Sequence, residues 1–275
     1  MSQRPRFPAR LPPLAELAPK RSLATAVEVL GSQPDAKARE RVLGEVPQPL
    51  PTWGQDLSVS TQAYRHKLMQ TILRQGVDDE RVLQAIGRIE RHRFVDSGLQ
   101  GQAYEDTSLP IGAGQTISKP NVVARMLALL LQAPLCQRGE GLARVLEVGT
   151  GCGYQAAVLS LLCKEVYSVE RIKELHLRAK SNLRPFRLPN VHLIFQDGSS
   201  GYPKGAPYSG IISAAGADVI PNSWYEQLAI GGRLVAPQSN ERGQQSLVVV
   251  DRTRQGFETS LCEDVQFVPL KSGTE

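Results

Sequence analysis

The sequence lacks several features that would place it in particular classes of protein. None of its apolar runs approaches the roughly 18 residues that a membrane-spanning helix needs, and the most apolar window, Met126 to Leu131, is short. The first residues, MSQRPRFPAR, contain neither the apolar core nor the small-residue cleavage site of a secretory signal peptide. We therefore expect a soluble protein without a membrane partner, although an Arg-rich, acid-poor start also resembles an organelle transit peptide.

Cysteine and histidine are scarce, with four residues of each. The cysteines show no C-x-x-C spacing, and no histidine has an H-E-x-x-H or i, i+4 partner. Metal sites and disulfide scaffolds usually show such spacings. We expect no bound metal, a reducing, cytoplasmic setting and four small core cysteines, namely Cys136, Cys152, Cys163 and Cys262.

A strong charge imbalance is also missing. The chain has 32 Lys and Arg against 27 Asp and Glu, a formal net charge of +5. Its basic residues, such as Arg88, Arg91 and Arg93, are spread along the chain, and most have acidic neighbours. The pattern favours a mixed solvated surface over a face that tracks phosphates, so we expect no nucleic-acid partner.

Proline is concentrated in the first part of the chain. Nine of the nineteen prolines lie within residues 1–58, a density that cannot sustain long helices or central strands. We expect residues 1–58 to form a mostly flexible extension of unknown role and residues 59–275 to form the folded domain.

Helical periodicity begins just after residue 60 and recurs to about residue 131. The first predicted helix ends near Gly76, and the second is capped by Asp78 or Asp79. The third begins at Ser118 to Pro120, because proline is favoured in a first turn. Between the last two helices, the polar, glycine-containing residues 96–115 indicate a functional loop. The apolar faces hold Leu68, Ile72 and Leu73, then Val82, Leu83, Ile86 and Ile89, then Val122, Val123, Met126, Leu127, Leu130 and Leu131.

From residue 144 onward, strands and helices alternate. This alternation is typical of right-handed βαβ units on a mostly parallel sheet. The last two strands, joined by an Arg-Gln-Gly turn, are expected to form an antiparallel hairpin. Strands are predicted at residues 144–148, 165–169, 191–195, 210–213, 233–237, 246–253 and 265–268, and helices at 154–163 and 172–183.

The most informative segment is the glycine loop Glu147-Val-Gly-Thr-Gly-Cys-Gly-Tyr154, which follows a predicted strand and opens a helix. Gly149, Gly151 and Gly153 let the backbone turn tightly and approach a ligand closely. The spacing G-x-G-x-G lacks the third glycine of the dinucleotide fingerprint at its usual offset. Glu147 would repel a phosphate but could receive an ammonium group, which indicates a cationic ligand.

Acidic residues end the next two predicted strands. Glu170 lies where a carboxylate can accept both hydroxyls of a ribose, and Asp197, followed by Gly198, could accept from the exocyclic amine of adenine. Together with Glu147, these acids describe a site for adenosine joined to a charged amino acid. S-adenosylmethionine fits this description better than a dinucleotide, although ordinary strand-end capping would explain the acids without a ligand.

The segment after the fourth of these strands indicates what kind of group is modified. It reads Ile211-Ile-Ser-Ala-Ala-Gly216 and lacks the Asn/Asp-Pro-Pro-aromatic motif of enzymes that methylate base amino groups. A Pro-Cys nucleophile for cytosine is also absent. A carboxylate substrate would need no base at neutral pH, because its pKa lies near 4, so catalysis would depend on positioning and desolvation.

Together, these segments resemble the protein-L-isoaspartate (D-aspartate) O-methyltransferase family. The resemblance covers roughly residues 60–271, and LPIGAGQTIS is its most family-specific part. It implies a Rossmann-like class I methyltransferase fold, a three-layer α/β sandwich with extra N-terminal helices. It also implies methyl esterification, from S-adenosylmethionine, of the free α-carboxylate of L-isoaspartyl and D-aspartyl residues in damaged proteins. The matching segments are VDDERVLQAIGRIERHRFV, LPIGAGQTISKP, VLEVGTGCGYQAAVLS, VYSVERIKEL, APYSGIISAA, QLAIGGRLVAP and FVPL.

The resemblance also assigns site residues. The family's active-site serine falls on Ser118, in a loop that closes over cofactor and substrate, although the same residue could cap the third helix. Ala214 and Ala215 would hold the peptide. No long apolar stripe is left over, which favours a monomer. The expected cofactor-binding residues are Thr116, Ile117, Glu147, Gly149, Thr150, Gly151, Cys152, Gly153, Glu170, Asp197 and Gly198.

The sequence departs from the family pattern at two positions. Cys152 stands where the family often has serine, and Gly216 stands where proline or alanine is more common; neither change should abolish cofactor binding. Three alternatives stay open: a methyltransferase acting on RNA or a small molecule, a catalytically idle binding module with the same fold, and a nicotinamide oxidoreductase. A methyl-transfer assay on aspartyl and isoaspartyl versions of one peptide would distinguish the first alternative from the activity that the resemblance implies.

Overall fold

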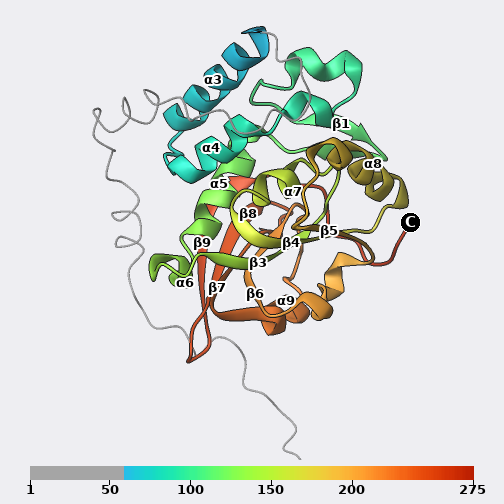
Figure 1. Ribbon diagram of the computed structural model, residues 1–275. Helices are drawn as coiled ribbons and strands as arrows, with labels where there is room; N and C mark the ends of the chain where they lie inside the picture. Colours follow the sequence, from blue (N-terminus) through green and yellow to red (C-terminus); the bar gives the residue numbers. More distant parts are fainter. Residues whose placement is uncertain (1–58) are drawn as a thin grey trace, which may run out of the picture. The chain divides into compact units, whose positions relative to one another are not determined.

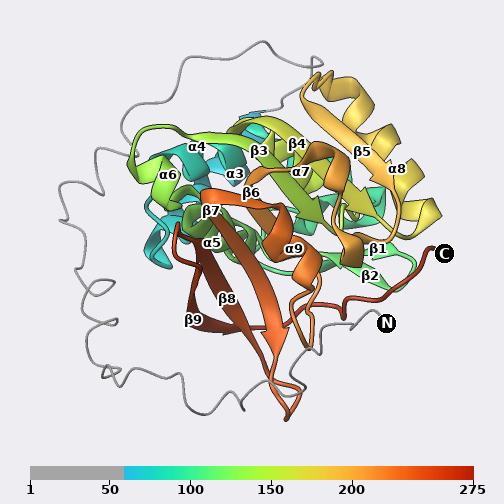
Figure 2. The ribbon, with the colours of Figure 1, turned by 90° about the horizontal axis from the view of Figure 1, so that it is seen from below.

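The structure is a computed structural model that describes residues 59–275. The extension predicted for residues 1–58 lies outside the described residues. The described part is an α/β structure in which a central sheet carries helices on both faces (Figures 1 and 2). The predicted fold class is therefore confirmed.

The central sheet has the strand order β5-β4-β3-β6-β7-β8-β9. Strands β3 to β7 pair in parallel, whereas β8 pairs antiparallel with both β7 and β9. This is the predicted parallel sheet with an antiparallel hairpin at its end. The strands are β3 (Leu142–Val148), β4 (Cys163–Glu170), β5 (Val191–Phe195), β6 (Tyr208–Ser213), β7 (Leu228–Ser239), β8 (Gln245–Arg252) and β9 (Phe257–Val265).

The helices of the described residues include short 3₁₀ segments between the longer elements. The α-helices are α3 (Val59–Arg74), α4 (Glu80–Arg88), α5 (Pro120–Leu131), α6 (Pro134–Gln137), α7 (Tyr154–Leu159), α8 (Lys173–Leu183) and α9 (Asn222–Gln227). The 3₁₀ helices are η2 (Arg91–Phe94), η3 (Ser97–Gln102), η4 (Arg184–Phe186), η5 (Gly198–Ser200) and η6 (Pro203–Gly205).

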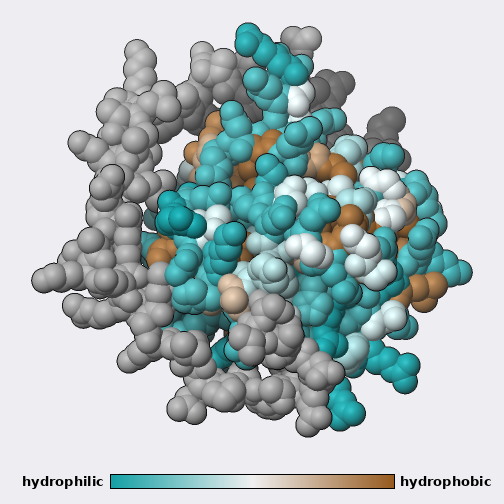
Figure 3. All heavy atoms as spheres, turned by 90° about the horizontal axis from the view of Figure 1, so that it is seen from above, coloured by the Kyte–Doolittle hydropathy of each residue, from teal (hydrophilic) through white to brown (hydrophobic). Residues whose placement is uncertain are grey.

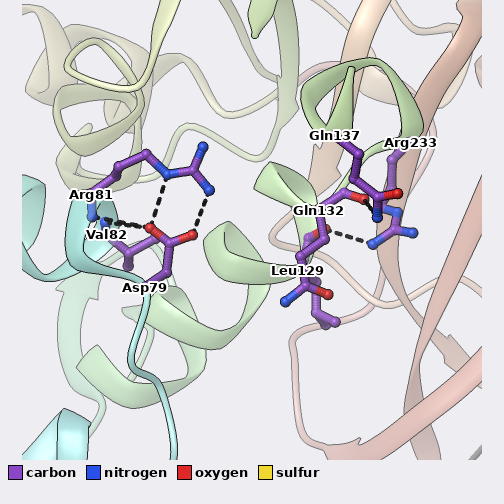
Figure 4. Close-up of polar contacts among 7 residues, drawn as sticks. All are labelled: Asp79, Arg81, Val82, Leu129, Gln132, Gln137 and Arg233. Carbon is purple, nitrogen blue, oxygen red and sulfur yellow. Dashed lines mark hydrogen bonds and ion pairs between the residues drawn. The ribbon is translucent and has the colours of Figure 1, made fainter. Parts of the chain in front are cut away.

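The N-terminal helices α3 and α4 pack against each other and against α5. Asp79 caps α4, since its Oδ1 accepts from the backbone nitrogens of Arg81 at 3.0 Å and Val82 at 3.4 Å (Figure 4). Such a cap satisfies donors that have no partner within the helix. After α3, Gly76 adopts a positive φ of 90°, as expected for a residue that ends a helix.

Successive residues of β3 face opposite layers of the molecule. Val145 lies in the larger apolar core, with residues of α3, α4, α5, α7 and α8. Leu146 and Val148 lie in the smaller core on the other face, with Trp224 of α9. Trp224 is fully buried, and its indole nitrogen donates to the Gly198 carbonyl at 2.9 Å. This alternation places Glu147 on the same face as α7.

One helix boundary and one loop differ from the sequence prediction. The predicted loop 96–115 contains η3 and most of a small antiparallel hairpin, β1 (Leu109–Gly112) and β2 (Gln115–Ile117). The predicted helix 154–163 ends at Leu159, whose carbonyl accepts from the Cys163 thiol at 3.2 Å. Asn190 donates to the next carbonyl, that of Ser160, at 2.9 Å. The chain leaves the helix through a tighter turn, in which the Leu161 and Leu162 nitrogens donate to the Val158 and Leu159 carbonyls at 3.1 and 2.9 Å.

The last strand also differs from the prediction. It is β9, at Phe257–Val265, and residues 266–268 lie outside any strand. Most side chains of β9 are exposed because it forms the edge of the sheet. An edge strand of this kind lacks the apolar alternation on which the sequence prediction relied.

Arg233 connects the antiparallel part of the sheet to α5. Its Nε and Nη2 donate to the two carboxylate oxygens of Asp251, each at 2.7 Å, across β7 and β8. Its Nη1 donates to the Leu129 carbonyl at 2.9 Å (Figure 4). The half of the sheet farthest from the glycine loop is thereby fixed to the helical layer.

Candidate active site

The carboxyl ends of the parallel strands meet at one edge of the sheet (Figure 2). The strand order reverses at β3, which has β4 and β5 on one side and β6 and β7 on the other. In open α/β sheets, ligands bind outside the carboxyl ends of the strands at such a switch point. The glycine loop begins where β3 ends, so the topology places it at this position.

The glycine loop has the backbone conformation that the sequence predicts. Gly149, Gly151 and Gly153 have φ values of 91°, 56° and 91°, a region that favours glycine. A Cβ on Gly149 would lie 3.4 Å from the Ala214 Cβ, and one on Gly151 would lie 3.2 Å from Ile111 Cδ1. The loop is therefore in close contact with both the segment after β6 and the β1–β2 hairpin.

The glycine loop is tightly packed at Gly153, Thr150 and Cys152. A Cβ at this position would lie 3.1 Å from two atoms of Leu183 on α8. Thr150, in the same loop, is buried and shares a hydrogen bond of 2.6 Å with the Ser168 hydroxyl. Cys152 is buried, and burial raises the pKa of its thiol to about 11. The thiol is therefore neutral at physiological pH, and all four cysteines are free.

Glu170 ends β4 and fixes the glycine loop to the neighbouring chain. Its Oε2 accepts from the Gly151 nitrogen at 2.8 Å, and its Oε1 accepts from the Ile172 nitrogen at 2.9 Å. The side chain is buried. A carboxylate can accept about four hydrogen bonds, so each oxygen retains capacity for one more donor, such as a ribose hydroxyl.

Glu147 is a fully buried carboxyl group on the face covered by α7. Ser168, its neighbour on β4, donates to Oε2, whereas Oε1 has no hydrogen-bond partner. Burial raises the Glu147 pKa to about 8, against the opposing effect of nearby Ser168 and Gln155. An unpartnered buried oxygen is costly, and a cationic group would satisfy it.

Asp197 follows β5 and is held by backbone donors. Its Oδ1 accepts from the Ser199 nitrogen at 2.8 Å, and its Oδ2 accepts from the Gly273 nitrogen at 2.7 Å. Partial burial would raise the Asp197 pKa, but these hydrogen bonds outweigh it and lower the pKa. Gly198 packs tightly, since a Cβ there would lie 2.6 Å from Val148 Cγ1.

Sequence reasoning did not assign a site role to the segment after β9. Its backbone pairs with Gly216, which donates to Val268 at 2.8 Å and accepts from Leu270 at 2.7 Å. Farther on, Glu275 forms an ion pair of 3.0 Å with Arg171, directly after β4. The segment thus contacts residues that follow β4, β5 and β6. The only sequence signal for it was the FVPL match.

Ser118 follows the β1–β2 hairpin directly and is half-buried. The prediction that it caps the third helix is wrong: Lys119 holds that position, and no side chain caps α5. Ile117 is buried, whereas Thr116 is exposed. Alternation along a short strand therefore separates these two predicted cofactor contacts onto opposite faces.

The hairpin is attached to the glycine loop and α8 at several points. Besides the close approach of Ile111 to Gly151, Arg178 of α8 donates from Nη1 to the Ile111 carbonyl at 2.8 Å. Its Nη2 forms an ion pair of 2.7 Å with Asp96. The hairpin that carries Ser118 is thus fixed next to the glycine loop.

Ala214 and Ala215 directly follow β6. The Ala214 nitrogen donates to the Val148 carbonyl at 2.8 Å, which aligns this segment with the start of the glycine loop. The Ala215 backbone forms a local turn, because its nitrogen donates to the Ser213 hydroxyl at 3.2 Å and its carbonyl accepts from it at 2.8 Å. The structure therefore brings Ala214 next to Gly149, as a shared site requires.

Metal centres and membrane-spanning helices are absent from residues 59–275. Among these residues, no group of three His, Cys, Asp or Glu side chains is arranged to hold a metal ion. Within the same range, the helices are too short or too polar to cross a bilayer.

Comparisons of the sequence identify related proteins. The family model for protein-L-isoaspartate(D-aspartate) O-methyltransferase matches residues 63–275. A protein-L-isoaspartate O-methyltransferase of Leptothrix cholodnii is 49% identical over 278 aligned residues, which cover 99% of this chain and 95% of that protein. One of Ralstonia nicotianae is 53% identical and covers 76% of this chain and 69% of its own.

Solved structures agree with the sequence comparisons. A protein-L-isoaspartate O-methyltransferase matches with a TM-score of 0.66 and 28% identity, covering 74% of this chain and 65% of that chain. A second, from Plasmodium falciparum in complex with S-adenosyl-L-homocysteine, matches with a TM-score of 0.64 and 23% identity, covering 74% and 97%. The similarity to the Plasmodium falciparum structure supports the fold alone. Because the family model spans most of the chain and the relatives are about half identical to it, the chain belongs to the protein-L-isoaspartate (D-aspartate) O-methyltransferase family.

Proposed function

We propose that the enzyme esterifies the free α-carboxylate of isoaspartyl residues in damaged proteins, with Ser118 orienting that carboxylate. The observation that carries the proposal is the meeting of the glycine loop, Glu147, Glu170 and Ala214 at one edge of the sheet. The hairpin preceding Ser118 is fixed next to the same loop. The glycine loop, which we propose binds the cofactor, therefore lies next to the hairpin that precedes the proposed substrate-binding serine.

The side chains at this edge fit S-adenosylmethionine, the cofactor of the family. Glu147 offers an unpartnered buried oxygen for the ammonium group of its amino-acid part. Glu170 retains acceptor capacity for the ribose hydroxyls, and Asp197 retains it for the adenine amine. When bound, S-adenosylmethionine supplies a methyl group made electrophilic by its sulfonium centre.

The protein's share of the reaction is positioning. The substrate carboxylate is ionised at neutral pH, so the enzyme needs no base to generate the nucleophile. The Ser118 hydroxyl would donate to one carboxylate oxygen and leave the other oxygen facing the cofactor site. Both N–H groups of Ala214 and Ala215 are bonded within the protein, so their main-chain carbonyls are the groups left to hold the peptide. Correct alignment of two bound reactants can account for a large part of a rate enhancement.

Ser118→Ala tests this assignment. We expect kcat/KM for an isoaspartyl peptide to fall by about 100-fold, since misplacing a reacting group by 1 Å can cost that much, while the Kd for S-adenosylmethionine stays unchanged. Ser108→Ala is the matched control, because Ser108 is an exposed serine directly before β1 of the same hairpin. Equal activity in wild type and Ser118→Ala would remove Ser118 from the mechanism.

We also propose that the catalytic unit spans residues 59–275 and acts as a cytoplasmic monomer. The free state of all four cysteines is consistent with a reducing compartment. On the face in Figure 3, the hydrophobic residues form separate areas among hydrophilic ones, which supports a monomer. Light scattering after gel filtration tests the oligomeric state directly, and a dimer mass would overturn this part of the proposal.

A further inference from the structure

Arg91 is a buried cation that the reaction described above does not use. The sequence groups it with the basic residues of a solvated surface, and the structure contradicts that prediction: its side chain is 0% exposed. It belongs to η2, in the family-matching segment RIERHRFV. Within residues 59–275, no carboxylate forms an ion pair with it, although its neighbour Arg93 pairs with Glu90.

The guanidinium of Arg91 contacts three elements of the site. Its Nη2 donates to the Ser118 carbonyl at 2.7 Å and reaches the Thr107 carbonyl, next to β1, at 3.5 Å. Its Cζ lies 4.8 Å from the centre of the Tyr154 ring, at the first residue of α7 after the glycine loop. One side chain therefore connects both ends of the hairpin to the helix that follows the glycine loop.

Stability does not explain a charge in this position. Burial lowers the Arg91 pKa below its ordinary value, and its Nε and Nη1 have no acceptor. Replacing buried charged groups by apolar side chains of similar size is often neutral or stabilising. A methionine in this position could neither donate a hydrogen bond to the Ser118 carbonyl nor place a cation over the Tyr154 ring.

We propose that Arg91 is a positioning residue, which holds the main chain of Ser118 at a fixed place relative to the glycine loop and so aims the Ser118 hydroxyl at the substrate carboxylate. The proposal rests on the role proposed for Ser118. The contacts of Arg91 are with the Ser118 and Thr107 carbonyls and the Tyr154 ring, so its proposed role is to position Ser118 and not to touch a reactant.

Arg91→Met is the first test. We expect kcat/KM for an isoaspartyl peptide to fall roughly 10- to 100-fold, with the Kd for S-adenosylmethionine within about threefold of wild type. Arg93→Met is the matched control: it removes an ion pair from the same 3₁₀ helix without touching the Ser118 carbonyl. We expect it to lower the melting temperature and to retain kcat/KM. Equal losses of activity in the two variants would overturn the proposal.

A double-mutant cycle tests whether Arg91 acts through Ser118. In a Ser118→Ala background there is no hydroxyl to aim, so Arg91→Met should then lower kcat/KM by less than about threefold. The same loss in both backgrounds would contradict the proposal. If Arg91→Met does not fold, Arg91→Lys replaces it in the cycle, since lysine keeps the charge and one donor but not the planar fork.

Hydrogen exchange separates a failure of this inference from a failure of the Ser118 assignment. We expect Arg91→Met to speed exchange of the backbone amides in residues 115–119, with β8 unchanged. If Ser118→Ala is fully active but this exchange still increases, the role of Ser118 is wrong and the holding role of Arg91 stands. Unchanged exchange in residues 115–119 would overturn the holding role.

Discussion

We expect S-adenosylmethionine binding to be linked to proton release from Glu147, the residue proposed to hold the cofactor's ammonium group. With a pKa near 8, its carboxyl group is almost fully protonated in the free enzyme at pH 6.5. The ammonium group of S-adenosylmethionine favours the ionised form. Two unit charges 4 Å apart attract by about 4 kcal/mol at an effective dielectric constant of 20, whereas lowering the pKa from about 8 to 6.5 requires about 2 kcal/mol. The attraction exceeds the requirement, so binding should release close to one proton.

Calorimetry in several buffers measures this release. The apparent binding enthalpy at pH 6.5 varies linearly with the ionisation enthalpy of the buffer, and the slope gives the number of protons exchanged. We expect a slope of about one released proton for wild type and close to zero for Glu147→Gln, which has no proton to release. Glu165→Gln is the control, because Glu165 is an exposed glutamate on the neighbouring strand, bonded to His192. A wild-type slope of zero, or the same slope in Glu147→Gln, would show that Glu147 releases no proton when the cofactor binds.

Two further predictions follow from the buried acids. Glu170→Ala should weaken S-adenosylmethionine binding by about 1 to 3 kcal/mol, or about 5- to 150-fold in Kd, through lost ribose hydrogen bonds; an unchanged Kd by calorimetry would place Glu170 outside the cofactor site. The Glu147 pKa is higher in the folded protein than in the unfolded chain, so as pH rises the unfolded chain loses this proton at a lower pH than the folded protein does. The group's contribution to the free energy of unfolding is therefore present below about pH 4.5 and is lost as pH rises towards 8. Urea unfolding should therefore show that Glu147→Gln is more stable relative to wild type at pH 8 than at pH 5. The same difference in unfolding free energy between the two proteins at both pH values would contradict the raised pKa of Glu147.

The sheet was predictable because its strands are buried and follow one another at regular spacing. Residues 191–195 match β5 in full, and the glycine loop was placed correctly between β3 and α7. Both signals are local, since they depend on short apolar runs and on glycines in sequence. By contrast, the bounds of β9 were not predicted, because an exposed edge strand has no apolar pattern. The strands β1 and β2 were not predicted because they are short and separated by glycines.

The acids proposed for the site could be located in the fold from the sequence, whereas their contacts could not. Glu147, Glu170 and Asp197 could be named because each lies at or next to the end of a parallel strand. Their partners could not be, because Gly273 is 76 residues away from Asp197 in the sequence. Arg91 was misjudged for the same reason: its contact with Ser118 spans 27 residues, and a basic residue in sequence gives no indication that it is buried.

We propose above that this enzyme recognises the carboxylate that isomerisation leaves free. The most direct measurement follows methyl transfer from labelled S-adenosylmethionine to two synthetic peptides that differ only in carrying an aspartyl or an isoaspartyl residue at one position. We expect a methyl ester on the isoaspartyl peptide and none above background on the aspartyl peptide. Equal methylation of both peptides, or of neither while the cofactor still binds, would contradict this recognition.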